Sequence, residues 1–192
     1  MKNVLILGAS GNIASKVIEI LLKRNDINLT LFLRNKNRLR INRGTNYKII
    51  EGDVLNFDEL KKAVFGQDIV YVNLAGDLGK MAKNIVKAMK ETGVKRVIFI
   101  SSIEIYNIPL KSILKPYRES ADIFESSGLE YTILRPAWFT HEDEINYELT
   151  KKGEAERGSV ISQKSLATFI SKIIENPEIH INENLGINRP NF

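Results

Sequence analysis

Seven consecutive residues near the start of the chain have types and spacing that can hold a phosphate group: Gly8, Ala9, Ser10, Gly11, Asn12, Ile13 and Ala14. Gly8 permits a tight turn, Gly11 lets the backbone come into contact with a pyrophosphate, and Ala14 allows a helix to pack closely on a sheet. Amide groups at the start of that helix bind phosphate oxygens, and Ser10 and Asn12 can add side-chain hydrogen bonds.

The position of this segment makes the pattern more specific. It stands between a short apolar run and a stretch of helical periodicity, at the first strand-to-helix junction, as a dinucleotide-binding loop requires. The alternative is a tight turn that binds no ligand. Arg34 follows the second apolar run, where an arginine accommodates the 2′-phosphate of NADP(H) and an acid would favour NAD(H). We therefore expect NADP(H) rather than NAD(H), the alternative being a surface arginine at a strand end.

Short apolar runs alternate with longer amphipathic stretches along the first 136 residues. Strands are expected at 4–7, 29–33, 47–51, 69–73, 97–100 and 131–134. Helices are expected at 12–24, 57–65, 80–91 and 113–126. Continuous apolar strands separated by helices indicate a parallel sheet covered on both faces. The predicted fold class is α/β, a doubly wound parallel sheet of the Rossmann type.

The pattern changes after Pro136. Residues 139–158 are polar and are expected to cross the surface, followed by a short strand near 160–161, a helix over 163–175 and an extended piece near 185–187. We interpret 1–192 as a single domain with a small C-terminal cap, in which 139–192 forms a reduced extension on the substrate side.

Composition excludes several kinds of site. The 192 residues contain no cysteine and only two histidines, His141 and His180, so no metal centre is expected. No apolar run is long enough for a signal peptide or a membrane span, and we expect a cytoplasmic protein.

The net charge is +5, and part of the basic excess is local. Five basic residues lie close together without an acid among them: Arg34, Lys36, Arg38, Arg40 and Arg43. This segment suits an anionic ligand or a solvated surface, and it lacks the aromatic residues typical of nucleic-acid binding. We expect a small-molecule partner, no nucleic acid, and a monomer or homodimer.

Further motifs follow in a characteristic order: Gly52-Asp53-Val54, Asn73-Leu74-Ala75-Gly76, Ser101-Ser102 and the run from Ser127 to Pro136. Together with the glycine segment, they resemble the atypical short-chain dehydrogenase/reductase group. That group includes NmrA-like proteins and NADPH-dependent flavin and biliverdin-type reductases. The resemblance extends from residue 3 to about residue 138.

The resemblance implies further cofactor contacts at the carboxyl ends of strands. They are Asp53 and Val54 at the adenine, Leu74, Ala75 and Gly76 along the ribose and pyrophosphate, Ser101 and Ser102 facing the nicotinamide, and Pro136, Ala137 and Trp138 as the wall beside it. Open α/β sheets bind ligands at these strand ends. For Asp53, a turn or helix-capping role is equally compatible with the sequence.

The predicted catalytic residues are Ser102 and Tyr117. Related reductases use a Tyr-x-x-x-Lys motif in which the lysine lowers the tyrosine pKa, but this chain has Ala121 at the lysine position. The alternative for Tyr117 is a packing or capping role. Hydride transfer to a conjugated ring does not require a strong acid, and Tyr106 and Trp138 are candidate walls for such a ring.

The function predicted from the sequence is therefore an NADPH-dependent oxidoreductase acting on a flavin, a quinone or a similar conjugated molecule. The alternative is a non-catalytic sensor of NADP(H), as in some NmrA-like proteins. The missing lysine favours the sensor, whereas the presence of Ser102 and Tyr117 is compatible with an enzyme.

Overall fold

Eight strands form one sheet in this computed structural model, which describes residues 1–41 and 47–190. The strands in spatial order are β3 (Tyr47–Glu51), β2 (Ile27–Leu33), β1 (Lys2–Leu7), β4 (Ile69–Val72), β5 (Arg96–Ile100), β6 (Glu130–Pro136), β10 (Glu183–Asn188) and β8 (Glu148–Lys151). All run parallel except β8, which is antiparallel to β10. The chain winds outward from β1 in both directions, which confirms the predicted doubly wound α/β sheet.

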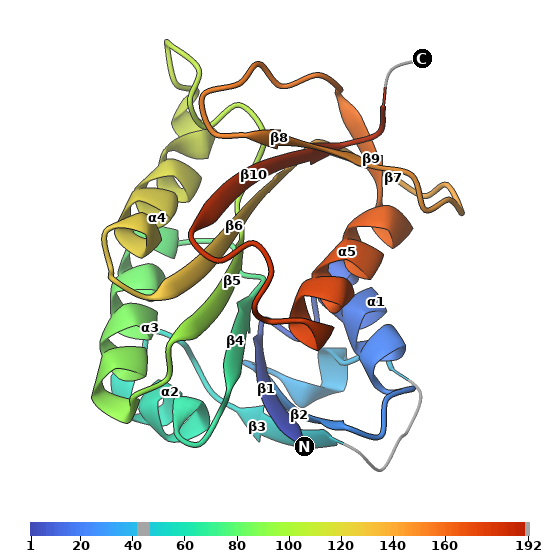
Figure 1. Cartoon of the computed structure of the whole chain (residues 1–192). Helices are drawn as coiled ribbons and strands as arrows, with labels where there is room; N and C mark the ends of the chain where they lie inside the picture. The colour runs from blue at the N-terminus through green and yellow to red at the C-terminus, as the bar shows by residue number, and fades with distance from the viewer. Residues whose placement is uncertain (42–46, 191–192) are drawn as a thin grey trace.

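Helices cover both faces of the sheet (Figure 1). One face carries α1 (Asn12–Leu21) and α5 (Gln163–Glu175), and the other carries α2 (Phe57–Val64), α3 (Leu78–Thr92) and α4 (Lys115–Glu125). Two short 3₁₀ helices, η1 (Lys36–Arg38) and η2 (Ser112–Leu114), lie in the connections.

The side chains of β1 alternate between two cores. Val4 and Ile6 pack in the core on the α1 and α5 side, whereas Leu5 and Leu7 pack in the core beneath α2, α3 and α4. Every residue of β4 and β5 is buried. Because both sheet faces are covered, β4 and the part of β5 after Arg96 are continuously apolar rather than alternating.

The part of the chain after Pro136 contains two strands that the sequence pattern did not indicate. β7 (Trp138–Thr140) pairs in parallel with β9 (Val160–Ser162), and β8 lies within the stretch expected to be a polar surface crossing. As the last strand of the sheet, β8 has a neighbour on one side only, so it does not need a long apolar run. The predicted strand near 160–161, the helix over 163–175 and the extended piece near 185–187 are confirmed as β9, α5 and β10.

Over the two described ranges, none of the helices has the length and hydropathy needed to cross a membrane.

Candidate functional site

The turn between β1 and α1 fits closely against the residue that follows β4. Gly8 has a φ of +81°, and a Cβ on it would collide with the carbonyl oxygen of Asn73. A Cβ on Gly11 would collide with Nδ2 of the same asparagine. The Asn73 amide donates to the Leu7 carbonyl at 3.0 Å, which holds the two segments together. Both glycines are therefore required by space, and Asn73 supports the loop, a role that the sequence analysis did not assign.

The amino end of α1 differs from those of three other helices. Among the described residues, no side chain caps its first turn: the N-cap residue is Gly11, and the first turn contains no acid. Side chains of Asn56, Asp77 and Ser162 cap α2, α3 and α5 by accepting backbone N–H groups. The first amides of α1, with the positive end of the helix dipole, are thus available to an anion.

The four predicted contact residues around Gly11 divide into two kinds. Ala9 and Ile13 are buried and anchor the loop in the core on the α1 side. Ser10 and Asn12 are exposed and can contribute side-chain groups to a ligand. The loop thus presents backbone amides and two short polar side chains to a ligand, while its two buried residues hold it in place.

Arg34 lies immediately after β2, two residues beyond Phe32, which contacts the glycine turn. The Gly8 amide donates to the Phe32 carbonyl at 3.0 Å. Arg34 is exposed and makes no hydrogen bond or ion pair with another described residue. Its guanidinium is therefore available to a ligand held at the turn. Arg43, at the other end of the predicted basic segment, lies outside the described residues.

Asp53 and Val54, after β3, have structural roles of their own. Oδ1 of Asp53 accepts the Leu55 amide at 2.9 Å, and the Asp53 amide donates to Glu59 at 3.0 Å. Val54 is buried, and its carbonyl accepts Nδ2 of Asn84 at 3.1 Å. The turn role that the sequence left open for Asp53 is thus present, and adenine contact at these two residues stays a prediction.

The predicted segment after β4 leads into α3. Leu74 is half-buried, whereas Ala75 and Gly76 are exposed. Gly76 has a φ of +110°, a conformation that favours glycine, and it precedes the N-cap residue Asp77. The backbone of Ala75 and Gly76 is therefore exposed, next to residues that contact the glycine loop.

Ser101, rather than Ser102, is the serine joined to Tyr117. Ser101 is buried; its amide donates to Leu134 at 2.7 Å and its Oγ donates to the Tyr117 carbonyl at 3.4 Å. Ser102 and Tyr117 are half-buried, and neither hydroxyl forms a hydrogen bond with another described residue. The structure therefore shows no direct link between the hydroxyls of the two predicted catalytic residues.

Ala121 points into the protein core, not toward the strand ends. It is fully buried in the core beneath α2, α3 and α4. Arg118, the nearest basic residue to Tyr117 in sequence, pairs with Asp122 at 2.9 Å and lies over the ring of Tyr106 at 4.5 Å. Neither position supplies Tyr117 with the cation that lowers a tyrosine pKa in the Tyr-x-x-x-Lys motif.

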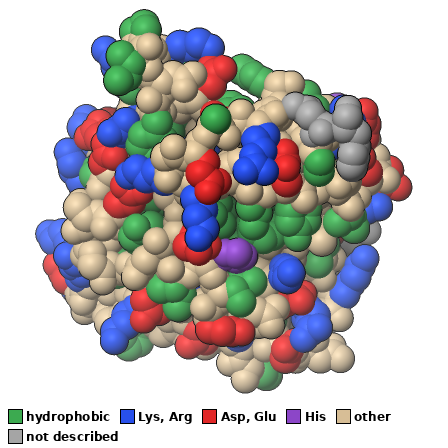
Figure 2. Space-filling view, turned by 45° about the horizontal axis from the view of Figure 1, so that its top comes forward, with side chains coloured by type: hydrophobic (Ala, Val, Ile, Leu, Met, Phe, Trp, Pro, Cys, Tyr) green, Lys and Arg blue, Asp and Glu red, His purple; other side chains and the backbone are tan. Residues whose placement is uncertain are grey.

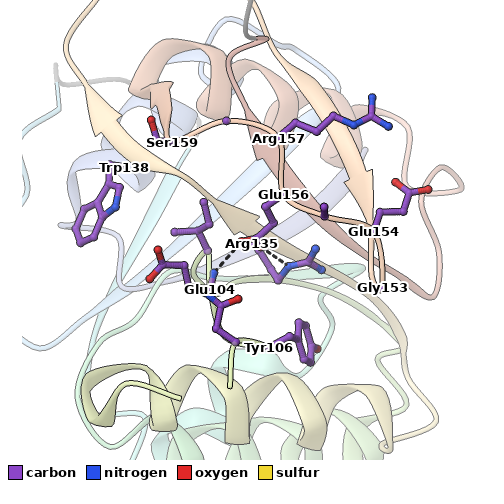
Figure 3. Close-up of a pocket in the computed structure, with 13 residues that line it drawn as sticks. Glu104, Tyr106, Arg135, Trp138, Gly153, Glu154, Glu156, Arg157 and Ser159 are labelled. Carbon is purple, nitrogen blue, oxygen red and sulfur yellow. Dashed lines mark hydrogen bonds and ion pairs between the residues drawn. The ribbon is translucent and has the colours of Figure 1, made fainter. Parts of the chain in front are cut away.

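The chain after β6 forms one wall of a cleft of about 820 Å³ (Figure 3). The Pro136 carbonyl accepts the Ile103 amide at 3.0 Å, which joins the ends of β6 and β5. Ala137 is buried, whereas Trp138 is 68% exposed and lines the cleft. The Trp138 amide donates to Ser159 at 2.9 Å, fixing the opposite end of this wall. Tyr106 lines the same cleft, so both candidate ring walls meet there.

An ion pair between the buried Arg135 and the half-buried Glu156 joins three segments around this cleft. Arg135 is 2% exposed, and its Nε lies 3.2 Å from Oε1 of Glu156. Oε2 of Glu156 accepts the Glu104 amide at 3.1 Å, and Nη1 of Arg135 donates to the Asn184 carbonyl at 3.1 Å. The sequence analysis gave these residues no role, although an arginine inside an apolar strand was a signal that Arg135 has a specific partner.

Tyr106 is surrounded by cations. Its ring lies 4.5 Å from Arg118, 4.8 Å from Lys152 and 5.4 Å from Arg135. Its hydroxyl accepts Nδ2 of Asn184 at 2.7 Å. Burial, followed by the nearby Glu125 carboxylate, raises the pKa of Tyr106 above the ordinary tyrosine value. The phenol therefore remains neutral at physiological pH.

The predicted cofactor-binding segments follow six strands that are consecutive in the sheet. From β3 and β2 through β1 and β4 to β5 and β6, their carboxyl ends lie along one edge. This order agrees with an adenine end near β3 and a nicotinamide end near β6. Figure 2 shows a face of the molecule on which acidic and basic side chains are interspersed, without an extended patch of one sign.

Residues 8–177 match the model of a protein family described as NAD(P)H-binding. A Rossmann-fold NAD(P)-binding family protein from Shigella flexneri is 52% identical, with a TM-score of 0.93 over 99% of this chain and 94% of that chain. A short-chain dehydrogenase/reductase from Veillonella parvula, solved in complex with NADP, is 28% identical, with a TM-score of 0.89 over 98% of this chain and 95% of that chain.

Two curated relatives are longer than this chain. Quinone oxidoreductase 2 of Escherichia coli (strain K12) is 24% identical over 82% of this chain and 55% of that protein. A chloroplastic divinyl chlorophyllide a 8-vinyl-reductase of Arabidopsis thaliana is 28% identical over 98% of this chain and 53% of that protein. The chain thus spans about half the length of these relatives. The family match covers most of the chain and confirms the predicted resemblance at the level of the family, so the protein belongs to the NAD(P)H-binding family with a Rossmann fold.

Proposed function

We propose that this chain is an NADPH-dependent oxidoreductase that reduces a flavin, a quinone or a similar conjugated small molecule. The observation that carries the proposal is the position of Trp138. It belongs to the predicted nicotinamide wall after β6, and it also lines the cleft of about 820 Å³. A ring stacked on this indole would lie beside the nicotinamide end of a dinucleotide held at the glycine turn.

The chain's own residues fit the dinucleotide. Gly8 and Gly11 leave room that a Cβ would fill, and the uncapped amides of α1 can bind the pyrophosphate. Arg34 has no other described partner and can bind the 2′-phosphate, which supports NADPH over NADH. The NADP in the solved Veillonella relative supports the same preference. When bound, NADPH supplies the hydride.

The absence of a cation at position 121 supports a conjugated acceptor over an isolated ketone. Ala121 is buried in the core, so the motif position that carries the lysine in Tyr-x-x-x-Lys offers Tyr117 no cation here. In a conjugated acceptor, the charge that arrives with the hydride spreads over the ring system, and solvent can supply the proton afterwards. The name of the relative quinone oxidoreductase 2 agrees with such an acceptor.

Steady-state oxidation of NADPH, followed at 340 nm with a panel of flavins and quinones, tests the proposal. We expect turnover with at least one acceptor and a lower KM for NADPH than for NADH. A Gly11→Ala variant, whose loop is obstructed by Asn73, is the matched control and should lose turnover through cofactor binding. If the protein binds NADPH but shows no turnover with any acceptor, the proposed oxidoreductase activity is contradicted.

A non-catalytic NADP(H) sensor is the second candidate, and one observation favours it. Neither Ser102 nor Tyr117 has a hydroxyl partner among the residues that the structure describes, so no assembled proton relay is present. In that case NADP⁺ and NADPH would bind tightly and alter the protein's conformation. Calorimetric binding of both forms, with zero NADPH oxidation on the panel, would favour the sensor.

A further inference from the structure

The Glu104 side chain has one carboxylate oxygen that its partners within the protein do not use. Oε2 accepts Nζ of Lys111 at 2.6 Å, and the side chain is 30% exposed. Oε1 has no hydrogen-bond partner within residues 1–41 and 47–190. Glu104 lines the cleft, and Figure 3 shows its carboxylate turned to the side on which Trp138 lies. A hydrogen-bond acceptor is therefore free beside the proposed stacking surface.

The arginines of the lining are directed elsewhere. Nε of Arg135 contacts Glu156, and its Nη2 lies 3.3 Å from the position that a Cβ on Gly186 would take. Figure 3 shows the Arg157 side chain pointing away from Trp138. Of the charged side chains described in the lining, the one turned toward Trp138 with a free oxygen is thus a carboxylate, which accepts hydrogen bonds and donates none.

The main chain holds Glu104 in an uncommon conformation. Its φ is +67°, in the left-handed region that residues other than glycine rarely adopt. Its amide donates to Oε2 of Glu156 at 3.1 Å, and its carbonyl accepts the Asn107 amide at 3.1 Å. Strain of this kind persists only where surrounding contacts fix it, and it is common at ligand-binding positions. The carboxylate therefore keeps its place before a ligand arrives, and little freedom is lost on binding.

We infer that Glu104 determines which acceptor the cleft takes, because its free oxygen accepts a hydrogen bond from a ring N–H. This inference rests on the proposed function and narrows the acceptor to a conjugated heterocycle of the isoalloxazine type. A ring stacked on Trp138 can present its edge to Glu104. An imide N–H in that edge pairs with the carboxylate, whereas the carbonyl oxygens of a quinone bring only further acceptors.

The reaction leaves this N–H unchanged. The hydride of NADPH forms an N–H bond at N5 of the isoalloxazine, and the displaced π electron pair moves to N1, which takes a proton from water. NADPH becomes NADP⁺, and the flavin becomes the dihydroflavin. The hydrogen on N3 stays bonded to Glu104 before and after, so the carboxylate orients the ring and neither gains nor loses a proton.

Lumiflavin and 3-methyllumiflavin test the contact because they differ only at N3, where a methyl group replaces the hydrogen. We expect kcat/KM of the parent protein to be about tenfold higher with lumiflavin. Glu104→Ala should lower kcat/KM for lumiflavin to the value for 3-methyllumiflavin. The value for 3-methyllumiflavin and the Kd for NADPH should stay within about threefold of the parent values. Lys111→Met is the matched control: it removes the same ion pair and keeps the carboxylate, so the preference for lumiflavin should remain.

The outcomes distinguish this inference from the proposed function. Equal kcat/KM for the two flavins in the parent protein, or equal losses with both in Glu104→Ala, would overturn the role of Glu104 and leave the oxidoreductase intact. A higher kcat/KM with menadione, a quinone, than with lumiflavin would do the same. If Glu104→Ala does not fold, Glu104→Gln, which removes the charge, should reduce the preference about threefold, and an unchanged preference overturns the inference. If the parent protein binds NADPH and reduces none of the three acceptors, the proposed function fails and the inference fails with it.

Discussion

Gly11 lies so close to Asn73 that the smallest side chain on the glycine would collide with the asparagine amide nitrogen. The two residues follow β1 and β4, the neighbouring strands between which the order of the sheet reverses. In open α/β sheets, ligands bind in the crevice at this reversal. The shape of the predicted phosphate loop is therefore set partly by a residue 62 positions further along the chain.

Gly11→Ala should weaken NADPH binding about tenfold, since obstruction of a packed contact costs about 1–3 kcal/mol. Asn73→Ala removes the atom that the new methyl group would meet. The double variant should therefore bind NADPH more tightly than Gly11→Ala alone. Isothermal titration calorimetry of the four proteins measures the coupling, and additive effects would contradict the contact.

Arg34→Ala should raise the Kd for NADPH about 10- to 100-fold and leave the Kd for NADH unchanged, because a charge-assisted hydrogen bond contributes about 1.5–3 kcal/mol. Arg38→Ala is the control: this residue is also exposed and basic, but it lies within η1. The melting temperature should not change in either variant. Equal losses for both cofactors would show that Arg34 does not contact the 2′-phosphate.

Ala121→Lys should not restore a Tyr-x-x-x-Lys site. Residue 121 is fully buried, so a lysine there must enclose its ammonium group or displace α4. We expect the free energy of unfolding to fall by about 3 kcal/mol, without a gain in ketone reduction. Urea denaturation measures this, with the exposed Ala155→Lys as a control that should change stability little. A fully stable Ala121→Lys protein with ketone reductase activity would refute the argument.

Tyr106 should make the fold more sensitive to alkaline pH. Burial and Glu125 raise its pKa in the folded protein above the unfolded value of about 10, so the folded state holds this proton more tightly. The stabilisation is fully present below pH ~10 and is lost as the pH rises through the folded value. Urea unfolding between pH 9 and 11 should therefore show a shallower decline for Tyr106→Phe than for the parent protein. The same decline of stability with pH in both proteins would contradict the raised pKa of Tyr106.

Most of the fold could be predicted from the sequence because buried parallel strands are apolar on both faces. The runs that became β1, β4 and β5 are unbroken, and the glycine turn follows the first of them. The four-residue strand β8, Glu-Leu-Thr-Lys, has a neighbour on one side only, so its composition did not distinguish it from a loop. Edge strands commonly lack the apolar signal for this reason.

The cofactor side of the site was easier to predict than the acceptor side. A phosphate loop is local, because seven consecutive residues carry the pattern. The contacts of Arg135 are not, since Glu156 and Asn184 lie 21 and 49 positions away. No spacing rule joins such residues before the topology is known. The same holds for the position of the missing lysine. The sequence identifies Ala121 at that position, but only the orientation of α4 shows that its side chain points into the core.

The place of β10 between β6 and β8 imposes an order on the protein's assembly. β8 is synthesised before β10, yet within residues 1–41 and 47–190 its one neighbour in the sheet is β10. While the ribosome is still making residues 152–182, β8 therefore has no strand to pair with, and the side of β6 that will receive β10 remains open. Both segments stay available to chaperones, proteases and other nascent chains until β10 emerges and completes the two pairings together.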